Sequence, residues 1–241
     1  MCYDDLMILF VLILGILPGF AWLVFYLKEE ETHRESKRLI FFAFAAGMAF
    51  GLIAVILENL LNTAGAGIGI AELSILGLVI FALIEEAAKF GAAYLTIGRS
   101  KVMHDPLDIM IYLVVAALGF ATLENIGSLA SFWIATRGMG VTSSFAGSFA
   151  ETLSLRFVGA TLLHSLTSGI VGYHWAVGVL RHKVARYLPL GLAIGTVLHA
   201  FFNLLILNYG NIAYALVFLT LLGFFVLNDF EKLKAVERSI K

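Results

Sequence analysis

The stretch Phe81-Ala82-Leu83-Ile84-Glu85-Glu86-Ala87-Ala88-Lys89-Phe90 decides the fold, because it places two carboxylates and an ammonium inside an apolar run. That run extends from Ile70 to Ile97, long enough for a helix of about 20 residues to cross the hydrocarbon core of a bilayer. A charged side chain at that depth costs at least about 2.5 kcal/mol. Glu85 and Glu86 precede Lys89 by four and three residues, so either can pair with it on one helix face. One lysine cannot neutralise both carboxylates, so the stretch predicts a buried functional site in a membrane helix.

Composition indicates that the whole chain is a multi-pass protein of the cell membrane. Of its 241 residues, 61% are hydrophobic and 14% are charged, which is too apolar for a soluble domain. The formal net charge is −1, and no basic run suggests a nucleic-acid partner. The single cysteine excludes an intramolecular disulfide and a thiolate metal cluster. We therefore expect an all-α membrane protein that contacts lipid and binds no nucleic acid.

Seven apolar windows predict seven transmembrane helices in a single domain, residues 1–241. The windows cover about 5–27, 39–61, 70–97, 106–134, 150–180, 187–208 and 211–228. Asp105 and Pro106 open the fourth window with residues typical of a helix cap and a first turn. Gly47 and Gly51 lie four residues apart, which predicts close packing of the second helix against a neighbour.

The distribution of basic residues predicts the orientation. Thirteen of the 16 Lys and Arg residues flank the windows on one side, and only Arg137 lies in a connector on the other. Cytoplasmic segments carry such an excess in membrane proteins. We expect the amino terminus outside the cell and the carboxyl terminus in the cytoplasm.

Windows three to six, about residues 70–208, each carry strongly polar residues at similar depth. The catalytic candidates are Glu85, Glu86, Glu124, His164, His199 and Asn203, with Lys89 and Asn125 as supporting residues. Any one of them is explained by a hydrogen bond between helices, but together they predict a functional site. Carboxylates beside imidazoles suit hydrolysis: a glutamate takes the proton of an attacking water, and a histidine orients that water or protonates the leaving amine. His199 and Asn203 share a helix face and can donate to an oxyanion.

Four segments resemble the motif set of PrsW-type intramembrane proteases, which are distant relatives of the CAAX prenyl proteases. They are Glu85-Glu86-Ala87-Ala88-Lys89, Phe120 to Asn125, His164 with Ser168, and His199 with Asn203. The resemblance spans residues 70–205, with the motifs in order on successive helices. It implies a membrane-embedded endopeptidase that cleaves a single-pass membrane protein, such as an anti-sigma factor. It also implies Glu85 or Glu86 as the base, and His199 and Asn203 as the oxyanion donors.

One departure from the CAAX proteases leaves the cofactor open. Those proteases have a histidine four residues after a phenylalanine, whereas here Phe120 is followed by Glu124 and the additional histidine is His164. Three carboxylates exceed one lysine in charge, and one Glu with two His is a familiar ligand set for catalytic zinc. No HExxH spacing is present, which argues against a metal. Two alternatives therefore stand, metal-free hydrolysis and a divalent ion such as zinc. The candidate ligands are Glu85, Glu86, Glu124, His164 and His199.

Two other functions fit the same residues. A proton- or cation-coupled transporter also uses buried acids and histidines, although the sequence shows no convincing inverted repeat. A non-catalytic scaffold that binds membrane helices is the other alternative. Cleavage of single-pass peptides would indicate the protease, and ion flux without cleavage would indicate the transporter.

Overall fold

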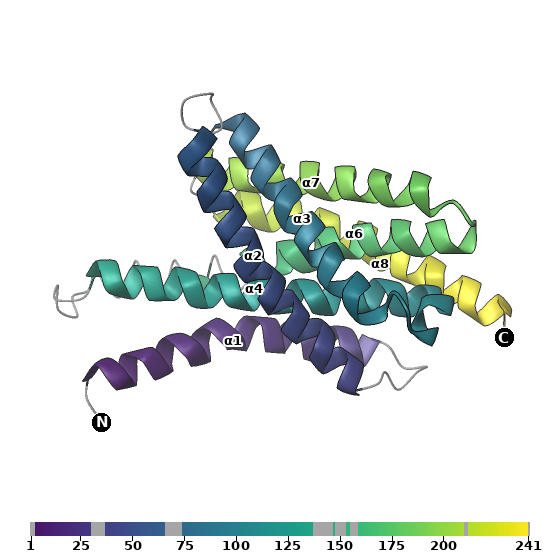
Figure 1. Cartoon of the computed structure of the whole chain (residues 1–241), viewed down its shortest axis with the longest axis horizontal. Helices are drawn as coiled ribbons and strands as arrows, with labels where there is room; N and C mark the ends of the chain where they lie inside the picture. The colour runs from purple at the N-terminus through teal and green to yellow at the C-terminus, as the bar shows by residue number, and fades with distance from the viewer. Residues whose placement is uncertain are drawn as a thin grey trace.

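The computed structural model describes residues 3–29, 37–65, 74–136, 147, 153–154, 159–209 and 212–240. Within these residues the fold is all-α, as predicted, with seven α-helices and one short 3₁₀ helix (Figure 1). The elements are α1 (Tyr3–Glu29), α2 (Lys37–Gly65), α3 (Ile75–Ile97), η2 (Lys101–His104), α4 (Pro106–Thr136), α6 (Thr161–Leu180), α7 (Val184–Tyr209) and α8 (Ile212–Ile240).

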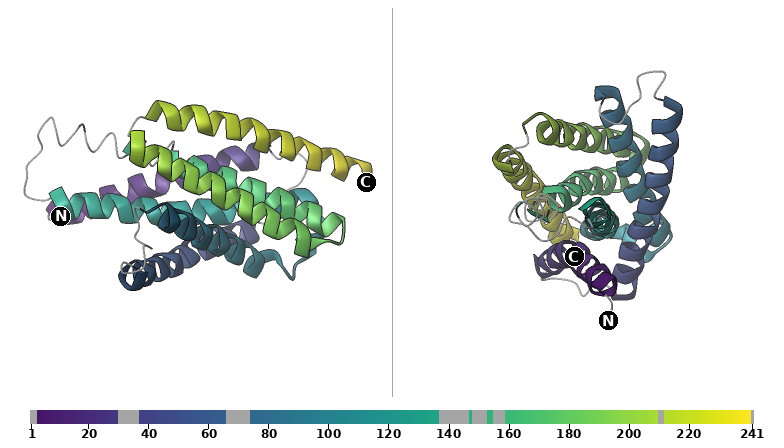
Figure 2. Two further views of the ribbon diagram at one scale, coloured as in Figure 1. Left: turned by 90° about the horizontal axis from the view of Figure 1, so that it is seen from above. Right: turned by 90° about the vertical axis from the view of Figure 1, so that its left-hand side faces the viewer.

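Helix α4 is the centre of the bundle. It makes extensive contacts with α1, α2 and α6, and the end-on view in Figure 2 shows it among the other helices. From Ile109 to Ala121 its side chains are almost completely buried, as expected of a helix that is apolar on all sides. Asp105 Oδ1 accepts a hydrogen bond from the backbone of Leu107 at 3.2 Å, which confirms the predicted cap. Glu124 and Asn125 are therefore carried by the most enclosed helix.

Helices α2 and α3 lie steeply across the other helices (Figure 1). Two glycines make the crossing of α2 and α4 possible. A Cβ added at Gly47 would overlap the carbonyl oxygen of Ala116, and one added at Gly119 would overlap the carbonyl oxygen of Phe44. Backbone therefore meets backbone at this point, and the close packing predicted for the second helix is confirmed.

Five of the described helices, α1, α2, α4, α7 and α8, are long and apolar enough to cross a membrane. The other two, α3 and α6, correspond to the third and fifth windows and carry buried polar residues. The first residues of α1 and the last of α8 lie at opposite ends of the bundle (Figures 1 and 2). Which end faces the cytoplasm stays a prediction.

One predicted boundary differs from the structure, the end of the seventh window. In the fifth window, which begins at 150, the described residues are helical at 153–154, form a π-helical turn at 159–160 and continue as α6 from Thr161. Arg156 and most of the connector 137–149 lie outside the described residues. The seventh window ends at 228, whereas α8 continues to Ile240. It continues because an amphipathic segment follows: Phe230 and Leu233 are buried, while Lys232 pairs with Asp229 at 2.8 Å on the exposed side.

Candidate active site

The predicted acids and histidines of four helices meet inside the bundle. Helix α3 contributes Glu85, Glu86 and Lys89, α4 contributes Glu124, α6 contributes His164 and α7 contributes His199. The side chains of Glu86 and Lys89 are 0% exposed, those of the two histidines 3%, and those of Glu85 and Glu124 10% and 20%. Charged groups this deep require partners, and the partners divide the cluster into distinct roles.

Glu86 is the carboxylate that pairs with Lys89. Its Oε1 atom lies 2.5 Å from Lys89 Nζ and also accepts hydrogen bonds from Thr167 Oγ1 and His199 Nδ1, both at 2.9 Å. Three donors on one oxygen hold the carboxylate in a fixed orientation. Because the carboxylate accepts, His199 donates through Nδ1, which leaves the lone pair on its Nε2. Glu86 therefore fixes the tautomer of His199.

Lys89 and Glu124 fix the tautomer of His164 in the same way. Lys89 Nζ lies 3.1 Å from His164 Nδ1, and its ammonium also stands over the Phe120 ring, 5.6 Å from the centroid. An ammonium only donates, so Nδ1 carries the lone pair and Nε2 carries the hydrogen. His164 Nε2 lies 2.6 Å from Glu124 Oε2 and donates to it.

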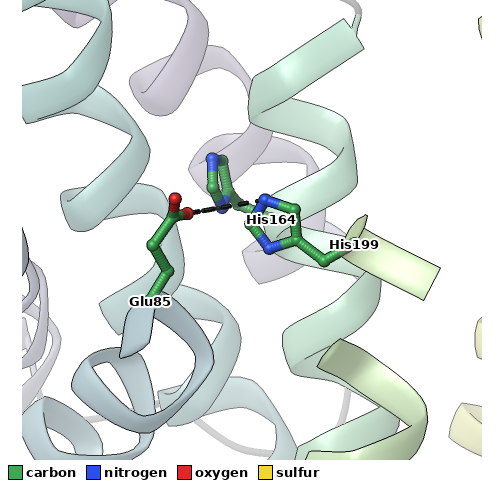
Figure 3. Close-up of side chains that lie close together, drawn as sticks. All are labelled: Glu85, His164 and His199. Carbon is green, nitrogen blue, oxygen red and sulfur yellow. Dashed lines mark ion pairs between the residues drawn. The ribbon is translucent and has the colours of Figure 1, made fainter. Parts of the chain in front are cut away.

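Glu85 is left facing both histidines. Its Oε2 atom lies 3.5 Å from His199 Nε2 and 3.8 Å from His164 Nδ1, and Figure 3 shows its carboxylate directed at the two rings. This oxygen is buried and accepts no hydrogen bond. The two nearest ring nitrogens carry no hydrogen, so all three atoms are electron-pair donors, although Lys89 donates to that of His164. Such an arrangement favours a cation or a proton between them.

These three atoms fit a metal ion. One donor atom from each of Glu85, His164 and His199 lies within 4.8 Å of the other two. Tetrahedral zinc with bonds of about 2.0–2.1 Å places its ligand atoms roughly 3.3 Å apart. The distances from Glu85 Oε2 to His199 Nε2 and His164 Nδ1, 3.5 and 3.8 Å, are only slightly longer. Each histidine also donates its outer hydrogen to a carboxylate, which is the usual support of a metal-bound imidazole. Of the five candidate ligands, Glu86 and Glu124 lie in that supporting position.

The two predicted amides follow residues of the cluster along α4 and α7. Asn203 is half-buried on α7, one turn after His199. Asn125 Nδ2 donates to Thr161 Oγ1 at 2.9 Å and so ties α4 to the start of α6, rather than to the acids. Ser168 is buried one turn after His164.

Sequence reasoning missed Thr167. Its hydroxyl reaches Glu86 and is completely buried. The available signal was its position three residues after His164 on the same helix.

Thr167→Val is expected to lower kcat about tenfold for the peptide cleavage that the motif resemblance implies. Valine keeps the shape of threonine but removes one hydrogen bond to a charged group, and such a bond contributes about 1.5–3 kcal/mol. The measurement is kcat and KM on a membrane peptide. Thr167→Ser should restore most of kcat, and Thr220→Val, at an exposed site on α8, should change nothing. Equal losses in Thr167→Ser and Thr167→Val would contradict the role of the hydroxyl.

Comparisons with known proteins decide the family. A profile of the PrsW family of intramembrane metalloproteases matches residues 35–228. The chain belongs to the PrsW family. Protease PrsW of Bacillus subtilis (strain 168) is 24% identical over 225 residues, which cover 92% of this chain and 94% of that protein. Protease PrsW of Clostridioides difficile (strain 630) is 26% identical over 81% of this chain and 77% of the relative. No solved structure matches the chain.

Membership in the PrsW family confirms several predictions. The chain is an intramembrane protease and a multi-pass protein of the cell membrane that acts on membrane-protein substrates within the bilayer. Nothing in the comparisons supports the transporter alternative. The family description names metalloproteases, and Glu85, His164 and His199 are residues of this chain that can hold a metal.

Proposed function

We propose that this PrsW protein hydrolyses a peptide bond of its substrate at the centre formed by Glu85, His164 and His199, with zinc as the bound metal. One observation carries the proposal. The buried Glu85 Oε2 accepts no hydrogen bond and faces two imidazole nitrogens that carry no hydrogen, while the other nitrogen of each ring donates to a carboxylate. One glutamate and two histidines are a ligand set found in catalytic zinc sites, where a water completes the coordination.

The surrounding residues receive distinct roles. When bound, zinc supplies Lewis acidity to the scissile carbonyl and makes a coordinated water more acidic. Glu86 and Lys89 orient the two histidines through the bonds described above. Glu124 is the most exposed carboxylate of the cluster, so it is the one that water and a leaving amine can reach to exchange a proton. Asn203, which shares a face of α7 with His199, donates to the oxyanion, since His199 Nδ1 is already used by Glu86.

The substrate of this centre is a single-pass membrane protein of the anti-sigma-factor type. The centre is enclosed by α3, α4, α6 and α7, so a peptide bond must be brought to it within the membrane. A lone transmembrane helix has no neighbouring helices of its own to hold it folded, and it can unwind locally to enter. The whole chain, 1–241, then acts as one transmembrane domain, with its amino terminus outside and its catalytic helices within about 70–208.

Removing the metal is expected to abolish cleavage. Purified enzyme in nanodiscs, incubated with 1,10-phenanthroline and dialysed, should lose at least 99% of its activity on a single-pass peptide and regain it with zinc. Elemental analysis should give about one zinc per chain before treatment. The 1,7-isomer, which does not chelate, is the control. Full activity in a metal-free preparation would disprove the requirement for zinc. Glu85 would then act as the general base without a metal.

A further inference from the structure

We propose that Lys89 competes with the metal for His164, so that its ammonium sets how tightly the centre holds zinc. The inference rests on the metal site proposed above and adds a positioning residue that controls its affinity. It follows from one atom, His164 Nδ1, which two partners require.

The competition is geometric. Nδ1 of an imidazole has a single lone pair. Lys89 Nζ takes it at 3.1 Å, while Glu85 Oε2 stands 3.8 Å from the same atom on the side of the candidate metal ligands. A metal between Glu85 and His199 therefore gains His164 only when the hydrogen bond from Lys89 to His164 breaks.

A second hydrogen-bond acceptor is available to Lys89 when that bond breaks. Its side chain is 0% exposed and held by Glu86 Oε1, so the ammonium cannot leave for water. The other oxygen of the same carboxylate, Glu86 Oε2, is buried and accepts no hydrogen bond. The ammonium can exchange His164 Nδ1 for this oxygen of the same carboxylate and so keep its ion pair. The move exchanges one hydrogen bond for another.

The charge of Lys89 works against the metal in both positions. Like charges a few ångströms apart repel strongly in a low-dielectric interior. In return, without a metal the ammonium keeps His164 Nδ1 free of a hydrogen, so the ring hydrogen stays on Nε2 and is donated to Glu124. Lys89 thus keeps the centre correctly arranged before the metal enters, at the expense of affinity.

The test compares zinc affinity in full-length variants in nanodiscs, measured by competition with a chromophoric chelator. Lys89→Gln removes the charge but keeps an N–H donor for Glu86, and it should bind zinc at least tenfold more tightly than wild type. Lys89→Met, which lacks any hydrogen-bond donor, should also bind zinc more tightly than wild type. It controls for an effect of the glutamine side chain itself. Lys89→Arg keeps the charge and should stay within threefold of wild type. Zinc should also raise the melting temperature of Lys89→Gln more than that of wild type.

Two outcomes overturn the inference in different ways. If wild type binds zinc and both Lys89→Gln and Lys89→Met bind it equally or more weakly, the competition is disproved. The proposed function is then unaffected. Absence of zinc binding in wild type and in all three variants disproves the metal in the proposed function, and the competition fails with it.

Discussion

Glu85→Gln is expected to reduce kcat/KM for peptide cleavage at least a thousandfold while the protein stays folded. The Glu85 carboxylate is the acid that faces both histidines, and its Oε2 atom accepts no hydrogen bond. Glutamine has nearly the same shape but holds a proton or a metal poorly. Since that oxygen makes no hydrogen bond, the substitution breaks none there. The measurement is kcat/KM on single-pass peptides in nanodiscs, together with the melting temperature and bound zinc.

Two matched substitutions make this result specific. Glu231→Gln, on the exposed part of α8, should leave cleavage unchanged. Glu86→Gln should instead lower the melting temperature, because it leaves the buried Lys89 without its counter-charge, a loss of about 3–5 kcal/mol. Cleavage by Glu85→Gln above one tenth of the wild-type rate would disprove the assignment. A wild-type protein that binds such peptides and cuts none would favour the scaffold.

Gly119→Ala is expected to destabilise the protein by roughly 3 kcal/mol or more, enough to lower the melting temperature by about 10 °C. The added methyl would overlap the carbonyl oxygen of Phe44, which is backbone of α2 and cannot rotate away as a side chain can. The two helices would have to separate at their closest point. That movement would also displace α3, which packs on both α2 and α4 and carries Glu85.

Gly127→Ala is the control for this effect, since it lies on the same helix, is exposed, and has no atom within 4 Å of an added Cβ. It should leave stability unchanged or raise it slightly, because alanine is the better helix former by about 1 kcal/mol. Thermal unfolding in one detergent measures both variants. Equal melting temperatures would mean that the crossing of α2 and α4 is looser than the structure shows.

Local sequence patterns predicted much of the fold and most of the residues that form the site. Apolar windows predicted seven helices, and Gly47 marked the crossing with α4. The predicted boundary that was wrong lies where the apolar pattern changes: an amphipathic segment extends α8 past residue 228. Hydropathy alone does not resolve an amphipathic continuation from a loop.

The sequence by itself determined that charged and imidazole side chains on four successive helices are buried in a membrane, because apolar length and composition allow no other solvent. Only the tertiary structure decided what each of them does. Spacing on α3 lets Lys89 reach Glu85 or Glu86 equally well. The packing of α6 and α7 against α3 places Thr167 and His199 on Glu86, so that Lys89 pairs there and Glu85 turns to the two histidines. Periodicity places residues on one helix face, whereas partners on other helices are chosen by how those helices pack.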